Sequence, residues 1–305
     1  MKRGVLIGIF RRMLFVAAAA VMTAVVVLCG GCSKETPLRV LYWNIQNGMW
    51  ADQGNNYDNF VEWVKRYDPD VCVWCEAQTI YEDGTNKARA AEDRYLPDNW
   101  GELAARYGHP YWTKSGHRDN YPQVITSKYP IEKVLDIIGE EPDSVVSHGA
   151  CHARIECGGR KINIVTLHTW PQAYGFGVGS ADQAASAANK EGDKYREFEI
   201  KYICAQTVNN PAYASCQDWL MMGDFNSFSP LDKNDLSGGN TINYQVHQTI
   251  LDNGYRDPVR EMNINFVRSC PTIYGGWTGP TESYKGSRID FIYASGEAMR
   301  NLLNA

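Results

Sequence analysis

The chain has 305 residues, of which 44% are hydrophobic and 21% are charged, and its formal net charge at pH 7 is −5. This length allows one or two domains, but no proline- or serine-rich linker, repeat or low-complexity block separates two, so we expect one domain with a sizeable core. The acidic balance does not suggest the basic stripe of a long nucleic-acid footprint, although it leaves a nuclease possible if a bound cation reverses the local charge.

The first 31 residues have the pattern of an export signal. Four basic side chains within the first twelve positions precede an apolar stretch, Met13 to Leu28, that is short for a membrane span. Small residues then lead to Cys32, and this ending resembles a bacterial lipoprotein signal in which Cys32 becomes the lipidated first residue. Cys29 departs from that pattern, since an aliphatic residue is usual there. An uncleaved anchor or a plain secretory peptide is the alternative.

Cleavage before Cys32 would leave residues 32–37 as a short tether and residues 38–305 as the folded domain. It would remove four basic and no acidic side chains, so the net charge of the remainder would be −9. In every version the domain is exported. We expect it on the cell envelope, anchored to the membrane through lipid and facing the periplasm or the surface.

Two strand-like segments in the first third of the domain end at polar residues. Alternating apolar residues from Leu38 to Tyr42 predict a strand that leads to Asn44. Apolar residues at helical spacing across 57–64 predict an amphipathic helix. A second apolar run, Val71 to Cys75, predicts a buried strand that ends at a lone carboxylate, Glu76.

Later segments repeat this arrangement. Six strand-like residues, Ile162 to Leu167, lead directly to His168, although a lone histidine is usually a structural hydrogen-bonding group. The positions Tyr195, Phe198, Tyr202 and Ala205 have the spacing of one buried helix face. Asp290 lies within the strand-like run 287–293. Strands interrupted by a few helices fit an α+β layered fold.

The strongest single signal is Gly223-Asp224-Phe225-Asn226, directly after the apolar run Trp219 to Met222. Side chains at i and i+2 of an extended segment point to the same side, so Asp224 and Asn226 should face a common point. This pair suits hydrolysis of a phosphate ester, because a carboxylate can orient or deprotonate water and an amide can donate a hydrogen bond to charge developing on phosphoryl oxygens. The same residue types are also common turn formers, which is the alternative interpretation of this motif.

Taken in this order, the blocks resemble the endonuclease/exonuclease/phosphatase superfamily, the DNase I-like metal-dependent phosphoesterases. The resemblance covers roughly residues 38–293, and its matching pieces are WNIQNG, PDVCVWCE, VTLHTW, GDFN and SRIDFIY. It implies a two-layer β-sandwich of the α+β class, with helices on its outer faces. It also implies an active site at one end of the sandwich, formed by loops from both sheets.

The resemblance further implies a role for each polar residue of these blocks. Glu76 matches the metal-binding glutamate, and Asn44 lies near the metal and the phosphate, with Mg²⁺ or Mn²⁺ as the cofactor; hard divalent cations prefer carboxylate and water oxygens. His168 would protonate the leaving group or hold a phosphate oxygen. Asp224 would position the attacking water, and Asn226 would stabilise the transition state.

Other polar residues have less specific patterns. Arg196 falls in a helix where the family often has a basic residue, but we expect it on a solvated helix face. His109, His117 and His148 lie in loop-like segments that could line the cleft. The pairs Cys151–Cys157 and Cys204–Cys216 are candidate disulfides in an exported chain, but sequence does not decide between bridges and free thiols.

The end of the chain departs from the family pattern. The family ends on a Ser-Asp-His run whose histidine is the general base, and Asp290 would orient that histidine. No histidine follows His247, and a last core strand would be missing. The chain is then either an incomplete reading frame or a phosphoesterase-like fold without its base. Because Asp290 and GDFN are intact, we expect the frame to continue beyond Ala305, and an in-frame stop codon directly after Ala305 would contradict this.

The sequence therefore predicts a metal-dependent hydrolase of phosphate esters, of phosphodiesterase, nuclease or phosphatase type, acting as a monomer on the cell envelope. Its substrate could be a nucleic acid, a lipid headgroup or a small phosphate ester. The alternative is a non-catalytic surface lipoprotein that uses the same fold to bind a phosphorylated or glycan ligand. The aromatic segment 274–280 is a candidate ligand loop for that alternative.

Overall fold

The structure is a computed structural model of the chain, and it describes residues 23–29, 36–82, 87–94, 96, 99–117, 120–138, 146–236, 238–270 and 287–305. The lipidation candidate Cys32 and the aromatic segment 274–280 lie outside these ranges. Across the ranges that are described, no helix combines the length and the apolar character that a membrane crossing requires.

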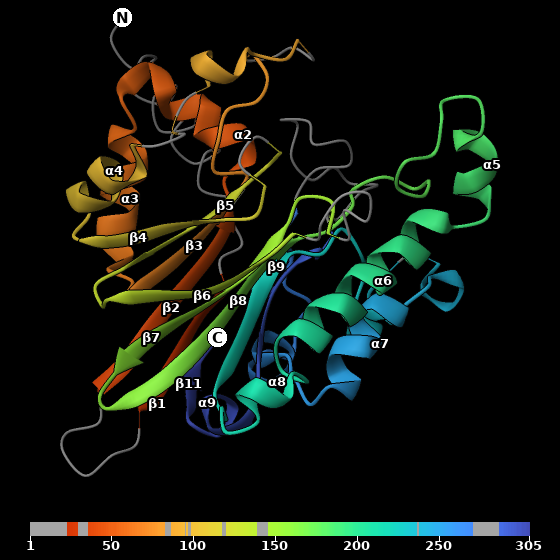
Figure 1. Cartoon of the computed structure of the whole chain (residues 1–305). Coiled ribbons are helices and arrows are strands. Elements are labelled where there is room, and N and C mark those ends of the chain that lie inside the picture. Colours follow the sequence, from red (N-terminus) through yellow and green to blue (C-terminus); the bar gives the residue numbers. More distant parts are fainter. Residues whose placement is uncertain are drawn as a thin grey trace, which may run out of the picture.

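Two mixed β-sheets lie face to face, with helices on the outer side of each (Figure 1). The first sheet has the strand order β11-β1-β2-β3-β5-β4, with β1 (Thr23–Cys29), β2 (Thr36–Asn44), β3 (Val71–Cys75), β4 (Tyr111–Ser115), β5 (Gln123–Ser127) and β11 (Leu302–Asn304). The second has the order β10-β9-β8-β7-β6, with β6 (Ile131–Ile137), β7 (Ala150–Cys157), β8 (Arg160–His168), β9 (Trp219–Asp224) and β10 (Asp290–Ala294). This is the expected α+β sandwich flanked by helices.

Alternate residues of the strands fill the space between the sheets. Leu38, Val40 and Tyr42 of β2 are buried there, in one cluster with Leu220 and Met222 of β9. Successive side chains of a strand point to opposite faces, so every second residue enters the same layer. Burying one such aliphatic side chain contributes about 1.5–3 kcal/mol. The alternation that predicts β2 from sequence is therefore the pattern that builds the central core.

Helices α3 (Asp58–Tyr67) and α4 (Trp100–Arg106) pack on the outer face of the first sheet. Phe60, Val61 and Val64 of α3 are buried against the sheet, which confirms the helix expected across 57–64. The remaining short helical elements are α2 (Gln46–Met49), α5 (Gln183–Ala188), α8 (Pro258–Met262), α9 (Gly296–Arg300) and the 3₁₀ turns Trp50–Asn55, Ala91–Asp93, Pro211–Tyr213, Pro230–Asp232 and Gly239–Thr241.

Helices α6 (Glu191–Gln206) and α7 (Gln245–Asp252) cover the outer face of the second sheet. A helix across 195–205 is confirmed, but the face expected to be buried is wrong: Phe198 is 52% exposed, whereas Arg196 and Glu199 are buried. The reason is that groups of nearby loops form hydrogen bonds with these two charged side chains. Those loops lie outside the helix, so the helix sequence alone does not predict the bonds.

The position of β1 differs from the expectation that residues 1–31 lie outside the fold. Residues Thr23–Cys29 pair antiparallel with β2 on one side and with β11 on the other. A run rich in β-branched residues has strand propensity, and the edge of β2 offers it unpaired backbone groups. Residues Thr23–Cys29, which fall in the apolar stretch of the predicted export signal, therefore form a strand of the first sheet. Cleavage before Cys32 stays a prediction.

The candidate disulfides are not formed. Cys151, Cys204 and Cys216 are free thiols, so neither Cys151–Cys157 nor Cys204–Cys216 is a bridge. Cys151 is instead buried in the core between the sheets, and Cys204 lies on the face of α6 that packs against the second sheet. These thiols act as small apolar side chains.

Parallel pairing within each sheet brings the polar strand ends together. In the first sheet β2 and β3 run parallel, with Asn44 opposite Cys75, the residue before Glu76. In the second sheet β8 and β9 run parallel, with His168 opposite Asp224. Each strand therefore delivers its last polar residue to the same edge of its sheet.

Candidate active site

Asn44 links the two sheets at this edge. Its Nδ2 donates hydrogen bonds to Glu76 Oε1 at 3.1 Å and to Asp224 Oδ2 at 3.0 Å. The backbone N–H of Gln46 donates to Asn44 Oδ1 at 2.9 Å, which fixes the orientation of the amide. In this arrangement Asn44 presents its nitrogen, rather than its oxygen, to the two carboxylates. The predicted role of Asn44 as a metal ligand stays a prediction.

Glu76 turns into the site because its backbone leaves the strand in a left-handed conformation. Its φ is +56°, which is uncommon for a residue with a side chain and marks a sharp turn directly after β3. Glu76 Oε2 accepts a hydrogen bond from the backbone N–H of Asn47 at 2.8 Å. One carboxylate oxygen therefore meets the loop after β2, and the other meets Asn44.

Asp224 and Asn226 form a turn rather than an extended pair. Asn226 has φ +46°, and its backbone N–H donates to Asp224 Oδ1 at 2.9 Å. The side chain of Asn226 donates to the carbonyl of Thr169 at 3.0 Å. The geometric expectation of i and i+2 side chains on one face of a strand is therefore wrong at Asn226, because β9 ends at Asp224. Asn226 joins the loop after β9 to the loop after β8.

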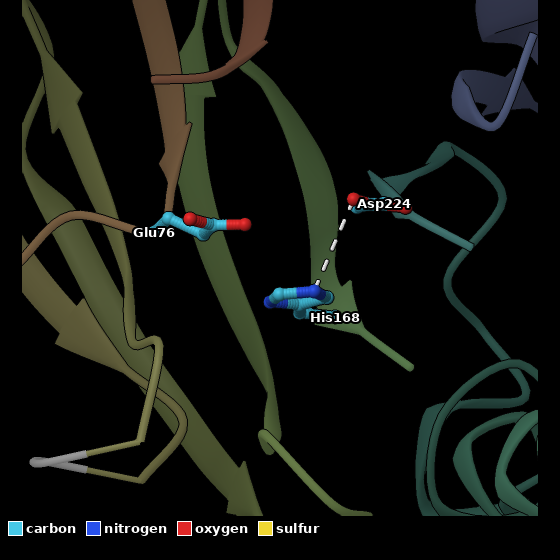
Figure 2. Close-up of side chains that lie close together, drawn as sticks. All are labelled: Glu76, His168 and Asp224. Atoms are coloured by element: carbon cyan, nitrogen blue, oxygen red, sulfur yellow. Dashed lines mark ion pairs between the residues drawn. The ribbon is translucent and has the colours of Figure 1, made fainter. Parts of the chain in front are cut away.

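His168 completes a compact group of ligand atoms with Glu76 and Asp224 (Figure 2). One ligand atom from each of the three residues lies within 4.8 Å of the other two, and His168 Nε2 is 3.9 Å from Asp224 Oδ2. Burial lowers the pKa of His168 to about 4, opposed by a hydrogen bond with the backbone of Tyr121. At neutral pH the imidazole is therefore uncharged, with one nitrogen able to donate and one able to accept.

Asp290 lies directly beside Asp224, because these two residues are partners in the antiparallel register of β10 and β9. Tyr42 Oη donates to Asp290 Oδ1 at 3.0 Å, and Ser269 Oγ donates to Oδ2 at 2.9 Å. Burial, followed by the charge of Asp224, raises the pKa of Asp290 well above its ordinary value. Both oxygens of Asp290 thus have partners within the chain.

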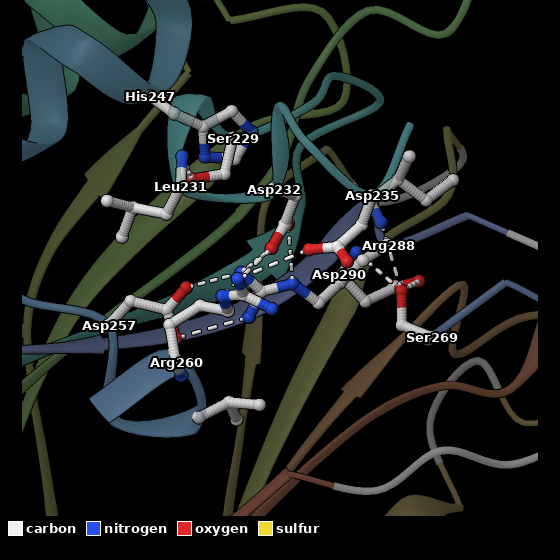
Figure 3. Close-up of polar contacts among 12 residues, drawn as sticks. Ser229, Leu231, Asp232, Asp235, His247, Asp257, Arg260, Ser269, Arg288 and Asp290 are labelled. Atoms are coloured by element: carbon white, nitrogen blue, oxygen red, sulfur yellow. Dashed lines mark hydrogen bonds and ion pairs between the residues drawn. The ribbon is translucent and has the colours of Figure 1, made fainter. Parts of the chain in front are cut away.

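The neighbouring Arg288 anchors β10 through two buried carboxylates (Figure 3). Its guanidinium donates to both oxygens of Asp232, at 2.8 and 3.0 Å, and to both oxygens of Asp257, at 3.2 and 2.6 Å. The guanidinium carbon also lies 4.3 Å from the ring centre of Phe291. Bidentate pairing of this kind fixes direction as well as distance. The network therefore sets the position from which Asp290 reaches the site.

The site carries several carboxylates and little compensating charge. Burial raises the pKa of Asp224 to about 6 and raises the pKa of Glu76 above its ordinary value. Among the described residues, no lysine or arginine forms an ion pair with Glu76, Asp224 or Asp290. Buried carboxylates without a cationic partner are costly. Oxygen-rich, negatively charged clusters of this kind fit a hard divalent cation such as Mg²⁺ or Mn²⁺.

One buried residue near the site, Glu199, was not found by sequence reasoning, and another, Arg196, was assigned wrongly. His148, one of the histidines named from sequence as able to line the cleft, lies beside His168, with ring centroids 4.4 Å apart. Glu199 accepts hydrogen bonds from the loop that carries His148 and from the loop that follows His168. Arg196 is buried, so the solvated helix face is wrong for it. No signal within the helix distinguished these two side chains, because charged residues occur along most of Glu191–Gln206.

The other histidines named from sequence do not join the group. His109 hydrogen bonds to Thr126 Oγ1 and to the carbonyl of Pro69, and His117 bonds to the carbonyl of Val146. His247 is buried between Ser227 and Tyr293, and burial lowers its pKa to about 3. These contacts are structural.

Comparison with known proteins gives an independent measure of the likeness. A model of the Endonuclease/Exonuclease/phosphatase family matches residues 41–302. No curated protein matches the chain. Similar solved structures include an AP endonuclease from Archaeoglobus fulgidus, with 18% identity, coverage of 85% of this chain and 86% of that chain, and a TM-score of 0.54.

A 3'-5' exonuclease (NExo) from Neisseria meningitidis has 14% identity, coverage of 84% and 86%, and a TM-score of 0.53. The human Nocturnin catalytic domain has 15% identity, coverage of 85% and 82%, and a TM-score of 0.52. At these identities the structural likeness shows a shared fold.

The raised carboxyl pKa values predict that a divalent cation stabilises the protein in a pH-dependent way. In the cation-free protein the folded state holds the Asp224 proton more tightly than the unfolded state does. The stability from that proton is therefore present at low pH and is lost as pH rises through about 6. Cations bind the deprotonated carboxylates, so Mn²⁺ should raise the melting temperature by several degrees near pH 7.5 and by much less near pH 5.

Differential scanning fluorimetry with and without Mn²⁺ measures this difference. The Glu76→Gln variant keeps the shape of the side chain but loses its charge, so its Mn²⁺-dependent gain near pH 7.5 should be strongly reduced. Equal gains at both pH values, or an unchanged gain in Glu76→Gln, would place the cation elsewhere.

Proposed function

Since the chain belongs to the endonuclease/exonuclease/phosphatase family, whose members hydrolyse phosphate esters, we propose that it is a phosphoester hydrolase that depends on Mg²⁺ or Mn²⁺. The observation that carries this proposal is the meeting of Glu76, Asp224 and His168 at the shared edge of the two sheets, with Asn44 bonded to both carboxylates. A packing role alone would not account for charged groups gathered without a cationic partner among the described residues.

Glu76 and Asp224 would hold the cation through their carboxylate oxygens. A bound divalent cation supplies positive charge that stabilises negative charge on the phosphoryl oxygens. Asn44 keeps the two carboxylates at a fixed separation, because its Nδ2 group donates one hydrogen bond to each of them. The residues present therefore fit the cofactor that the family implies.

Asp224 is suited to orient or deprotonate the attacking water. Its Oδ1 is fixed by the N–H of Asn226, and its Oδ2 faces Asn44 and His168. Without a cation the pKa of Asp224 is about 6, so the carboxylate is deprotonated at neutral pH and can accept a hydrogen bond from the attacking water.

His168 fits one of its two predicted roles better than the other. A pKa of about 4 leaves the imidazole neutral at pH 7, so few molecules carry the extra proton that general acid catalysis needs. A neutral imidazole N–H still donates a hydrogen bond. We therefore assign His168 to holding a phosphoryl oxygen, and Asn226 to fixing the loop that carries His168 through the carbonyl of Thr169.

The net charge favours a small or lipid-linked phosphate ester over a long nucleic acid as substrate. The chain has 30 basic and 35 acidic residues, and removal of the export signal would make the remainder still more acidic. Proteins that follow a nucleic-acid backbone usually present a basic surface to it. The nuclease neighbours in structure share the fold, and their substrates do not transfer through that likeness.

Activity is tested with bis(p-nitrophenyl) phosphate, a diester that releases coloured p-nitrophenol. Turnover should require Mg²⁺ or Mn²⁺ and stop with a chelator. Asp224→Asn should lower kcat by about a hundredfold or more, the size of effect seen when one charge-stabilising group is removed from an active site. The absence of cation-dependent turnover in a folded protein would favour the non-catalytic binding lipoprotein.

The matched control is Asp252→Asn, the same substitution at an exposed position of α7. Its activity should equal that of the unmodified protein. Asn47, in the loop beside Asn44, is unsuitable as a neutral control: its side chain bonds to the backbone of Ile80 and Tyr81. If Asp252→Asn loses as much activity as Asp224→Asn, the chemistry does not lie at Asp224.

We also propose that the enzyme works on the bacterial cell envelope, attached through lipid on Cys32. The support is the basic start, the apolar stretch and the small residues that lead to this cysteine. Cys32→Ser should abolish incorporation of labelled palmitate and release the domain from the membrane fraction. Palmitate labelling that persists in the variant would rule out Cys32 as the attachment site.

A further inference from the structure

Helix α6 holds both backbone polar groups of one residue, Trp170, in the loop after His168. The backbone N–H of Trp170 donates to Glu199 Oε2 at 2.9 Å. The carbonyl of Trp170 accepts a hydrogen bond from Arg196 Nη1 at 2.7 Å, and the same nitrogen donates to the carbonyl of Gln172 at 2.9 Å. Because Glu199 and Arg196 lie one turn apart on α6, the loop cannot shift along the helix without losing these bonds.

The second oxygen of Glu199 holds a different loop. Both the backbone N–H and the Oγ of Ser147 donate to Glu199 Oε1, each at 2.8 Å. Ser147 is the residue before His148, and its carbonyl accepts a hydrogen bond from Asn120 Nδ2 at 2.8 Å. Asn120 Oδ1 in turn lies 3.0 Å from His148 Nδ1. The orientation of the His148 ring therefore follows from the position of Ser147.

The two loops meet where the histidine rings touch. The ring centroids of His148 and His168 are 4.4 Å apart. The backbone N–H of His168 donates a hydrogen bond to the carbonyl of Gly149 at 3.4 Å. His168 is the residue whose ring faces Asp224 in the candidate site. One carboxylate thus joins the segment before His148 to the segment after His168.

We propose that Glu199 is a positioning residue of the active site. Its carboxylate holds the loop that carries His148 and the loop that follows His168 at the separation that keeps the His168 ring against Asp224. The catalytic part of this inference rests on the proposed function. The positional part does not, because it concerns only where the two rings lie.

A carboxylate is required at this position for a specific reason. Three donors converge on Glu199, two at one oxygen and one at the other, so both oxygens must be acceptors. A glutamine of the same shape would present an NH₂ group to a backbone N–H at one of the two ends. Burial raises the pKa of Glu199 to about 7, and the hydrogen bonds from Trp170 and Ser147, together with the charge of Arg196, oppose this rise.

The test compares Glu199→Gln with Glu197→Gln, a matched control on the same helix whose side chain pairs with Lys201 instead of a loop. The chain has six histidines. Selective ¹³C and ¹⁵N labelling of histidine therefore gives an NMR spectrum with few ring signals, and each signal can be assigned by substituting one histidine at a time. In Glu199→Gln the ring signals of His148 and His168 should shift, and those of His109 and His152 should not. In Glu197→Gln none of the ring signals should shift.

Turnover of bis(p-nitrophenyl) phosphate gives the second readout. Misplacement of a substrate-contacting group by about 1 Å can cost up to a hundredfold in rate, so kcat of Glu199→Gln should fall about tenfold to a hundredfold. KM should change by less than about threefold, because the groups that bind the cation are untouched. If the unmodified protein shows no turnover, the proposed function fails, and the spectra still decide the positional claim.

Ser147→Ala provides a milder variant if Glu199→Gln does not fold. It removes only the Oγ donor and leaves the backbone donor to the same oxygen. It should shift the ring signals of His148 more than those of His168. Unshifted signals of both rings in a folded Glu199→Gln, or in Ser147→Ala when the former is unfolded, would overturn the proposal.

Discussion

The direction of two strand pairs decides where this molecule can carry out chemistry. β2 and β3 run parallel in one sheet, β8 and β9 run parallel in the other, and the polar residues that end these strands meet at one edge of the sandwich. Antiparallel pairing would have sent successive strand ends to opposite edges. The hydrogen bonds from Asn44 to Glu76 and Asp224 then join the two sheets at that edge.

This arrangement carries an electrostatic cost that the rest of the site offsets only in part. Asp224 is buried, Glu76 and Asp290 are partly buried beside it, and the pKa of each is raised. Hydrogen bonds from Asn44, Tyr42 and nearby backbone groups offset part of this cost. The carboxylates of Asp232 and Asp257 are paired differently, because Arg288 forms bidentate hydrogen bonds with both and Arg260 also pairs with Asp232. No such ion pair forms with Glu76, Asp224 or Asp290 among the described residues, and this contrast supports the proposed cation.

Sequence reasoning picked out those candidate residues that a pattern of neighbouring residues in the chain marks. Glu76 and Asp224 could be found because an apolar run followed by one acid is visible in the chain, and the family resemblance ordered these runs. Sequence reasoning failed where a residue depends on a partner far along the chain. Glu199 and Arg196 lie on the buried face of α6 because they form hydrogen bonds with Ser147 and Trp170. The spacing of residues within the helix does not predict these bonds.

Two other differences have the same origin. Asn226 was expected on the same face as Asp224, but its left-handed backbone and its bond to Thr169 replace strand geometry with a turn. The segment Thr23–Cys29 was expected outside the fold, yet the edge of β2 accepts it as a strand. In both cases the local pattern is compatible with two outcomes, and tertiary contacts select between them.

The central claim is that the edge shared by the two sheets binds a divalent cation through Glu76 and Asp224. The most direct measurement is anomalous diffraction from a crystal soaked in Mn²⁺, recorded at the manganese absorption edge. The account predicts the strongest anomalous peak within coordination distance of the Glu76 and Asp224 carboxylates, at about 2.0–2.3 Å. A strongest peak bound elsewhere, with none beside Glu76 and Asp224, would contradict it.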